Sequence, residues 1–270
     1  MIEESSENRV RVSVHLFGLT SAAAGIMDFI WGRFEPFHQP LQAIGGQIAS
    51  VKIIVYLGAL VLVAGGVAIP TKRAGKYGAA ALAVIYGIFG VATLRRLYIA
   101  PLYLGYHIAV FIGVLSTTAT MLMLVVAALI VCWSDSFRDT LPETKDRTAR
   151  WAFGLCSVNF GLAHLTGIKA TASMIPSWMP LGGDIWVVIS GIAFVLAGVG
   201  IISGYKDVLA ARLLTIMLLI FSLIVLAPLI FTAPRNEISW GANLYNLTAV
   251  ASAWIMADSL GNWEPGKAPA

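Results

Sequence analysis

Long apolar runs recur along the chain, and each ends at a short stretch that contains proline, glycine or charged residues. A helix of about 20 residues crosses the hydrocarbon core of a bilayer, and these runs have that length. Only helices and closed barrels satisfy their backbone groups inside a bilayer, and the runs are too long for strands. We therefore predict an all-α fold with eight transmembrane helices. The expected spans cover residues 12–31, 47–69, 77–94, 105–133, 151–168, 184–203, 208–232 and 241–260.

The composition agrees with a membrane protein and excludes an ordinary soluble domain. Hydrophobic residues make up 58% of the chain and charged residues 12%, whereas soluble domains carry about 25% charged residues. The formal charge is +4, but the basic residues are scattered through the loops. This scatter gives no basic arm for nucleic acid, so the expected partner is the lipid bilayer. The acidic, polar first ten residues do not resemble a signal peptide, so we expect the first helix to be retained.

Lysine and arginine favour one side of the predicted membrane. With the N-terminus inside, twelve basic residues fall on the inner segments and five on the outer loops. This asymmetry predicts a multi-pass protein of the plasma membrane with both termini in the cytoplasm. The strongly charged segment 134–150 lies at the midpoint. The expected division is therefore a first four-helix unit at 1–137, a cytoplasmic linker at 138–150 and a second unit at 151–270.

The two halves share a pattern of small and aromatic residues. Because each half holds four spans, an even number, both copies would insert the same way up as a parallel repeat. Glycines seven residues apart suit close helix packing, although chance recurrence in glycine-rich helices is an alternative. The matches are Phe17, Gly18, Leu19 and Gly25 with Phe153, Gly154, Leu155 and Gly161, at an offset of 136, and Gly58 and Gly65 with Gly191 and Gly198, at an offset of 133.

Four stretches of the second half carry a family resemblance. They are Gly161-Leu-Ala-His-Leu165, Met174-Ile-Pro-Ser-Trp-Met-Pro180, Trp186 to Gly198 and Leu209-Ala-Ala-Arg-Leu-Leu214. Together they resemble the DoxX-like integral membrane proteins, best over 150–232 and less over the first half. The resemblance implies two fused four-helix units. It also implies a link to quinone-dependent redox complexes, because the family includes a subunit of a thiosulfate–quinone oxidoreductase. It transfers no catalytic residue.

Charged and polar residues near the expected outer ends of the spans are the candidate catalytic groups. Ionisable side chains inside a membrane are costly and call for a partner or a role. Asp28 and Lys52 provide an acid and a base in the first half, and His164 and Asp184 do so in the second. His164 takes the repeat position of Asp28. We expect Asp28 to pair with Lys52 and His164 with Asp184, the latter as a proton-handling pair.

Further residues at the same ends are candidates for ligand binding. Arg95 and Arg96 would bind an anionic or carbonyl group. Apolar loops at 32–46 and 169–183 would lie over the bundle at the membrane interface, although aromatic anchoring alone would also explain their tryptophan. The remaining candidates are His107, Asn243, Asn246 and Trp178.

Three interpretations of this polar set compete. The groups could be structural ion pairs, a site for a quinone or lipid head group, or a haem site. Haem held by His107 and His164 is disfavoured because a lone histidine on an apolar helix is more often hydrogen-bonded structure. None of the four histidines, which include His15 and His38, has HxxxH or HxxxE spacing, so we predict no metal site.

The leading hypothesis is a membrane protein of quinone-linked redox metabolism that binds an amphipathic molecule between the halves. The sequence shows no motif that binds an electron-carrying cofactor, so a redox partner subunit would have to supply electrons. Whether the chain itself is an enzyme stays open, and a second copy of the chain is another candidate partner. The alternative is a non-enzymatic transporter or an assembly protein, which a duplicated bundle fits equally well.

Overall fold

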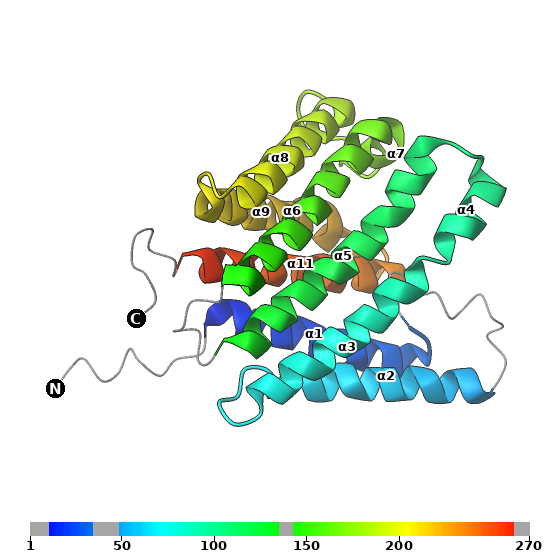
Figure 1. The fold of residues 1–270 in the computed structure, drawn as a ribbon. Helices are drawn as coiled ribbons and strands as arrows, with labels where there is room; N and C mark the ends of the chain where they lie inside the picture. The colour runs from blue at the N-terminus through cyan, green and yellow to red at the C-terminus, as the bar shows by residue number, and fades with distance from the viewer. Residues whose placement is uncertain (1–10, 35–48, 135–142, 262–270) are drawn as a thin grey trace.

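The described residues form a bundle of helices (Figure 1). The structure is a computed structural model that describes residues 11–34, 49–134 and 143–261. All of its regular elements in these ranges are helical, which confirms the all-α prediction. The elements are α1 (Val12–Trp31), α2 (Ala49–Ala68), α3 (Gly75–Thr93), α4 (Arg96–Leu104), α5 (Ile108–Trp133), α6 (Glu143–Thr166), α7 (Ile168–Ala172), α8 (Gly183–Ser203), α9 (Asp207–Phe221), the π-helical turn η3 (Ser222–Leu226), α10 (Ala227–Thr232) and α11 (Glu237–Leu260).

Five helical stretches in the described residues are long and apolar enough to cross a membrane, so this is a multi-pass membrane protein. They are Val12–Trp31, Gly75–Leu104, Ile108–Trp133, Gly183–Ser203 and Asp207–Thr232. Their outer faces carry exposed aliphatic side chains, such as Ile192 and Leu196 on α8, as contact with lipid requires. The apolar part of α2 is shorter, and α6 and α11 are long but more polar.

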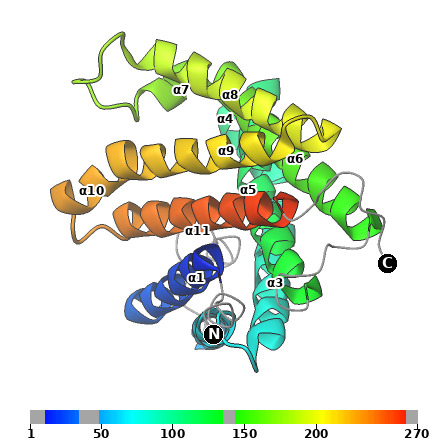
Figure 2. The same cartoon turned by 90° about the vertical axis from the view of Figure 1, so that its left-hand side faces the viewer.

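Neighbouring helices pack in a closed circuit that α5 and α11 divide into two rings. The circuit runs α1, α2, α3, α5, α6, α8, α9, α11 and back to α1, and α5 also packs against α11. We call α11, α1, α2, α3 and α5 the first ring, and α5, α6, α8, α9 and α11 the second ring. Figure 2 shows α11 between α9 and α1. The two rings therefore share one wall.

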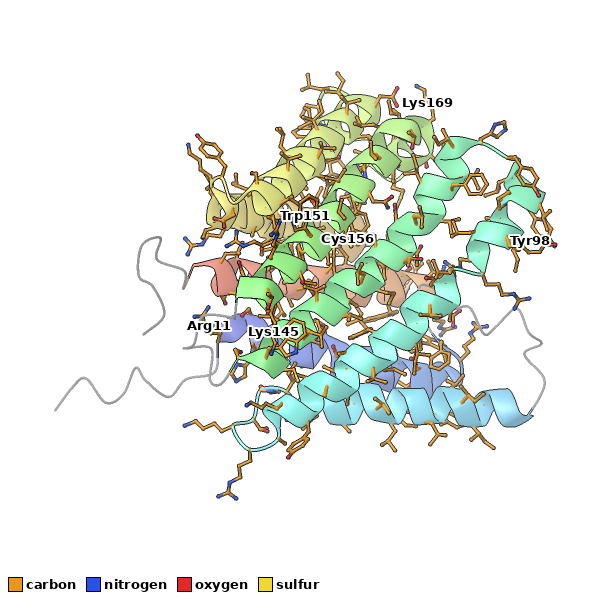
Figure 3. All side chains as sticks on the ribbon, viewed as in Figure 1. Arg11, Tyr98, Lys145, Trp151, Cys156 and Lys169 are labelled. Carbon is orange, nitrogen blue, oxygen red and sulfur yellow. The ribbon has the colours of Figure 1, made fainter. Side chains whose placement is uncertain are left out.

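The helices run between two ends of the bundle. The termini end holds the start of α1 and the end of α11, and the far end lies opposite (Figure 1). Figure 3 shows Arg11 and Lys145 at the termini end, and Lys169 and Tyr98 away from it. Helix α6 begins at Glu143, so the charged loop expected over 134–150 is shorter than predicted. Arg150 Nε lies 2.5 Å from Asp146 Oδ2, one turn earlier, and this pair stabilises the first turns of the helix.

Glycines bring two pairs of helices into backbone contact. A Cβ atom on Gly154 of α6 would lie 2.7 Å from the Gly198 carbonyl oxygen of α8. A Cβ on Gly18 of α1 would lie 2.4 Å from the Gly66 carbonyl oxygen of α2. The glycine of α2 that makes a contact like that of Gly198 is thus Gly66, whereas the sequence match paired Gly198 with Gly65. Gly65 instead faces Leu82 of α3.

Aromatic side chains fill the interior of the first ring. Phe17, Phe34, Tyr86 and Phe89 are each at most 2% exposed. The rings of Phe34 and Phe89 meet edge to face with centroids 5.0 Å apart, and those of Phe17 and Tyr86 lie 6.1 Å apart. Gly58 lies under the Phe34 ring, because a Cβ there would come within 2.7 Å of it. Because Gly58 has no side chain, the Phe34 ring can pack directly against α2.

Replacing Gly198 by alanine should destabilise the bundle. The added Cβ would lie 2.5 Å from the Gly154 carbonyl oxygen, which is backbone and cannot move aside without shifting α6. Overpacking of this kind costs about 2 kcal/mol, which thermal unfolding in detergent can measure. Gly113→Ala is the matched control, because a Cβ at Gly113 has no neighbour within 4 Å and alanine favours a helix. Equal melting temperatures for the two variants would refute the close α6–α8 contact.

Candidate functional site

A cavity of about 160 Å³ lies inside the second ring. All five helices of that ring contribute to its lining. An engineered protein cavity of about 150 Å³ holds one benzene molecule, so this cavity has the size of a single six-membered ring. Its apolar wall consists mainly of Met123, Phe160, Phe194, Met217, Leu218 and Phe221. Its polar lining consists of Thr120, His164, Ser190, Tyr245 and Asn246.

His164 contributes an imidazole near the end of α6. Its Nδ1 lies 2.9 Å from the carbonyl oxygen of Phe160, one turn earlier. A carbonyl oxygen can only accept, so Nδ1 carries the hydrogen and donates it. The ring also packs against Phe194, with centroids 5.1 Å apart. In a neutral imidazole that carries its hydrogen on Nδ1, Nε2 is an acceptor.

Asn246 of α11 is held by the backbone of α9. Its Nδ2 donates to the Leu218 carbonyl oxygen at 2.9 Å and to Ser222 Oγ at 2.6 Å. One turn away, Nδ2 of Asn243 donates to the Leu226 carbonyl oxygen at 2.6 Å. The Leu226 carbonyl belongs to the π-helical turn η3, and the Leu218 carbonyl lies one turn before it. The sequence marked both asparagines as ligand-binding candidates, and only Asn246 lines the cavity.

Pro228 gives a physical reason for the π-helical turn. Proline has no N–H and its ring clashes with the carbonyl four residues earlier, so an α-helix must kink or widen before it. Here η3 precedes α10, in which Pro228 is the second residue. The Leu218 carbonyl, one turn before η3, accepts from the backbone N–H of Ser222 as well as from Asn246.

The structure does not bring the predicted acid–base pairs together. The carboxylate of Asp184 pairs with Lys169, and both side chains are largely exposed, at 49% and 87%. Asp28 is fully buried, whereas Lys52 is exposed on the outward face of α2. Among the described residues, no ion pair joins His164 to Asp184 or Asp28 to Lys52. The apolar sequence located these residues within spans but did not determine which way each one faces.

The other predicted ligand-binding residues lie outside the cavity. Arg95, His107 and Trp178 are exposed and Arg96 is half-buried. The loop at 169–183 does cover part of the bundle, because Ile175 packs on a small core cluster of α11 and η3. Its tryptophan points outward. His38 lies outside the described residues.

Metal and haem find no support in the described part of the chain. It contains no group of three or more histidine, cysteine or acidic side chains close enough to hold one metal ion. His107 is exposed at the start of α5, whereas His164 lines the cavity. Cys132 and Cys156 are both free thiols.

The sequence did not indicate Thr120, Ser190 or Tyr245. Each hydroxyl donates to a backbone carbonyl: Thr120 to Ser116 at 3.2 Å, Ser190 to Val187 at 3.0 Å and Tyr245 to Thr117 at 3.3 Å. Hydroxyls that bond the carbonyl three or four residues earlier are ordinary in apolar helices, so their sequence carries no signal. Only the spacing of Phe160 and His164 gave a signal, because residues four apart lie on the same face of a helix.

The most buried ion pairs lie at the termini end, away from the cavity. Arg150 donates to Asp146 and to Asp207, and its side chain is only 10% exposed. Burial alone would lower the pKa of Arg150, but hydrogen bonds to the two carboxylates outweigh burial and raise that pKa above its ordinary value. Nearby, Asp258 accepts from Ser13 Oγ at 2.7 Å. These contacts connect α6 to α9 and α1 to α11.

One comparison with known proteins gives a match. The family model for DoxX matches residues 147–227. This segment includes α7, α8, α9 and η3 in full and most of α6. The matched segment contributes Phe160, His164, Ser190, Phe194, Met217, Leu218 and Phe221 to the cavity. No curated protein and no solved structure matches the chain.

Removing one carboxylate from each ion pair should show that the buried pair contributes more to the free energy of unfolding than the exposed pair. Asp207→Asn leaves the buried Arg150 with one ionic partner fewer, which should lower the free energy of unfolding by about 3 kcal/mol. Asp184→Asn breaks an exposed pair and should cost less than about 1 kcal/mol. Both values come from unfolding in detergent. A larger loss for Asp184→Asn would contradict this assignment and restore a structural role for that residue.

Proposed function

Because residues 147–227 form a DoxX family domain of a multi-pass membrane protein, we propose that the chain binds the ring of a quinone-type amphipathic molecule in the second-ring cavity. The observation that carries this proposal is the cavity itself: its volume suits one ring, and its lining combines aromatic walls with a few polar groups. Phe160 and Phe194, with ring centroids 5.6 Å apart, form one aromatic wall. His164 and Asn246 provide the polar contacts.

The apolar tail of such a molecule would leave the cavity beside α9. Met217 and Phe221 line the cavity and are only half-buried. Their neighbours Ile216 and Ile220 are exposed on the outer face of the same helix. On this side, therefore, only the side chains of α9 separate the cavity from lipid. A ring inside and a tail in the bilayer is the placement that this arrangement favours.

The proposal includes eight membrane spans in two parallel four-helix units. Helices α6 and α11 have 24 residues each, enough to cross a bilayer. Their polar residues Asn159, His164, Asn243 and Asn246 form hydrogen bonds within the bundle, so their lower hydropathy does not argue against crossing. The similar glycine contacts of α1 with α2 and of α6 with α8 support the repeat. The excess of basic residues at the termini end supports cytoplasmic termini.

Quinone-linked redox metabolism is the setting that this proposal favours, as the DoxX resemblance implied. The role proposed for this chain is to bind and orient the ring, and to hold a hydrogen of it at His164 Nε2. Electrons would come from or go to a partner subunit. Of the residues singled out from the sequence, only His164 and Asn246 belong to this proposed site.

Filling the cavity should abolish ring binding. We expect Ala249→Leu, which adds three carbons at a residue of the cavity lining, to weaken phenol binding by more than tenfold. Equilibrium dialysis of the full chain in nanodiscs against protein-free nanodiscs corrects for phenol dissolved in lipid. Quinone extracted from the purified protein and measured by its absorbance should fall in parallel.

Two further variants make this experiment decisive. His164→Phe keeps the bulk of a ring but removes the polar contact, and should weaken phenol binding while the protein stays folded. His107→Phe, at an exposed position outside the cavity, should leave binding unchanged. Saturable phenol binding that survives Ala249→Leu would refute the cavity as the site.

A further inference from the structure

The polar side chains that line the cavity use their donor hydrogens inside the protein. The hydroxyls of Thr120, Ser190 and Tyr245 each donate to a backbone carbonyl. His164 donates through Nδ1 to the Phe160 carbonyl. Asn246 uses its amide nitrogen twice, for the Leu218 carbonyl and for Ser222 Oγ. None of these groups has a hydrogen left over for a ligand.

The atoms that remain can only accept. His164 Nε2 makes no hydrogen bond within the described part of the chain, and neither does Asn246 Oδ1. The oxygen of Ser190 keeps its lone pairs after donating its hydrogen. The Leu218 carbonyl fixes the orientation of the Asn246 amide, since only the nitrogen side can face a carbonyl oxygen. The acceptor character therefore follows from backbone contacts.

From this geometry we infer that the cavity selects a ring that donates a hydrogen bond, and so prefers a hydroxyl-bearing ring, such as a quinol, to the corresponding quinone. This inference rests on the proposed function, because it assumes that the cavity is the binding site. A hydroxyl on the ring would donate to His164 Nε2 or Asn246 Oδ1. A quinone carbonyl would face acceptors only, and an unmatched buried polar group is costly.

The lining also argues for a neutral donor over a cationic one. No aspartate or glutamate contributes to the cavity lining among the described residues. Asp184, the acid that the sequence predicted for the second half, is paired with Lys169 and does not line the cavity. A buried ammonium ion without a carboxylate would be strongly disfavoured. A neutral hydroxyl group is thus the hydrogen-bond donor that fits these acceptors.

Two rings of equal size test the inference. Phenol donates through one oxygen, whereas cyclohex-2-enone has one carbonyl oxygen that only accepts and so represents the quinone. We expect phenol to bind at least about tenfold more tightly than cyclohexenone in wild-type protein, after both are corrected for partition into protein-free nanodiscs. In His164→Phe the ratio should fall towards one, and in His107→Phe it should stay as in wild type.

The outcomes separate the two claims. If cyclohexenone binds as tightly as phenol, and Ala249→Leu abolishes both, the cavity is a ring site but the donor preference is wrong. If neither ring binds saturably to wild-type protein, the proposed function itself is wrong. The wild-type comparison decides the preference even if His164→Phe fails to fold.

Discussion

Backbone carbonyls accept the hydrogens of nearly every polar side chain that the described interior of this bundle holds near its cavity. A bilayer offers no water to helix interiors, so each buried donor must find its acceptor within the protein. The hydroxyl of Tyr245 bonds a carbonyl of α5, and Asn243 and Asn246 bond carbonyls of α9 and η3. These bonds connect α11 to both of its neighbours in the second ring. They also determine what kind of ligand atom the cavity can satisfy.

The two rings share a wall, and at one level a side chain fills the first ring where a cavity lies in the second. In the repeat that we propose, α1 corresponds to α6 at an offset of 136, and the contacts Gly18–Gly66 and Gly154–Gly198 make α2 correspond to α8 at an offset of 132. At that offset Gly58 corresponds to Ser190. Gly58 is covered by the ring of Phe34, whereas Ser190 lines the cavity. The Phe34 ring thus occupies the interior of the first ring beside Gly58, whereas the second ring has its cavity beside Ser190.

The sequence predicted the helices well because bilayer thickness alone sets their length. The first helix was predicted at 12–31 and is found there. Hydropathy says which residues enter the membrane but not which face turns inward, so it could not show that Asp28 is buried and Lys52 exposed. The partner of Asp184 was missed because Lys169 sits beyond the helix end, on the short helix α7, which apolar length cannot reveal.

Two of the helices that contribute polar groups to the cavity are more polar than the other helices of the two rings. Helix α6 carries His164 and α11 carries Asn246, and neither is among the five described stretches that are long and apolar enough to cross a membrane. Each polar residue lowers the hydropathy of its helix, but it costs little stability once its hydrogens are bonded to carbonyls inside the bundle. In α6 and α11 the bonded residues His164 and Asn246 face the cavity inside the bundle. These two helices stand on different sides of one cavity, and the carbonyls that satisfy their donors leave it with acceptors alone.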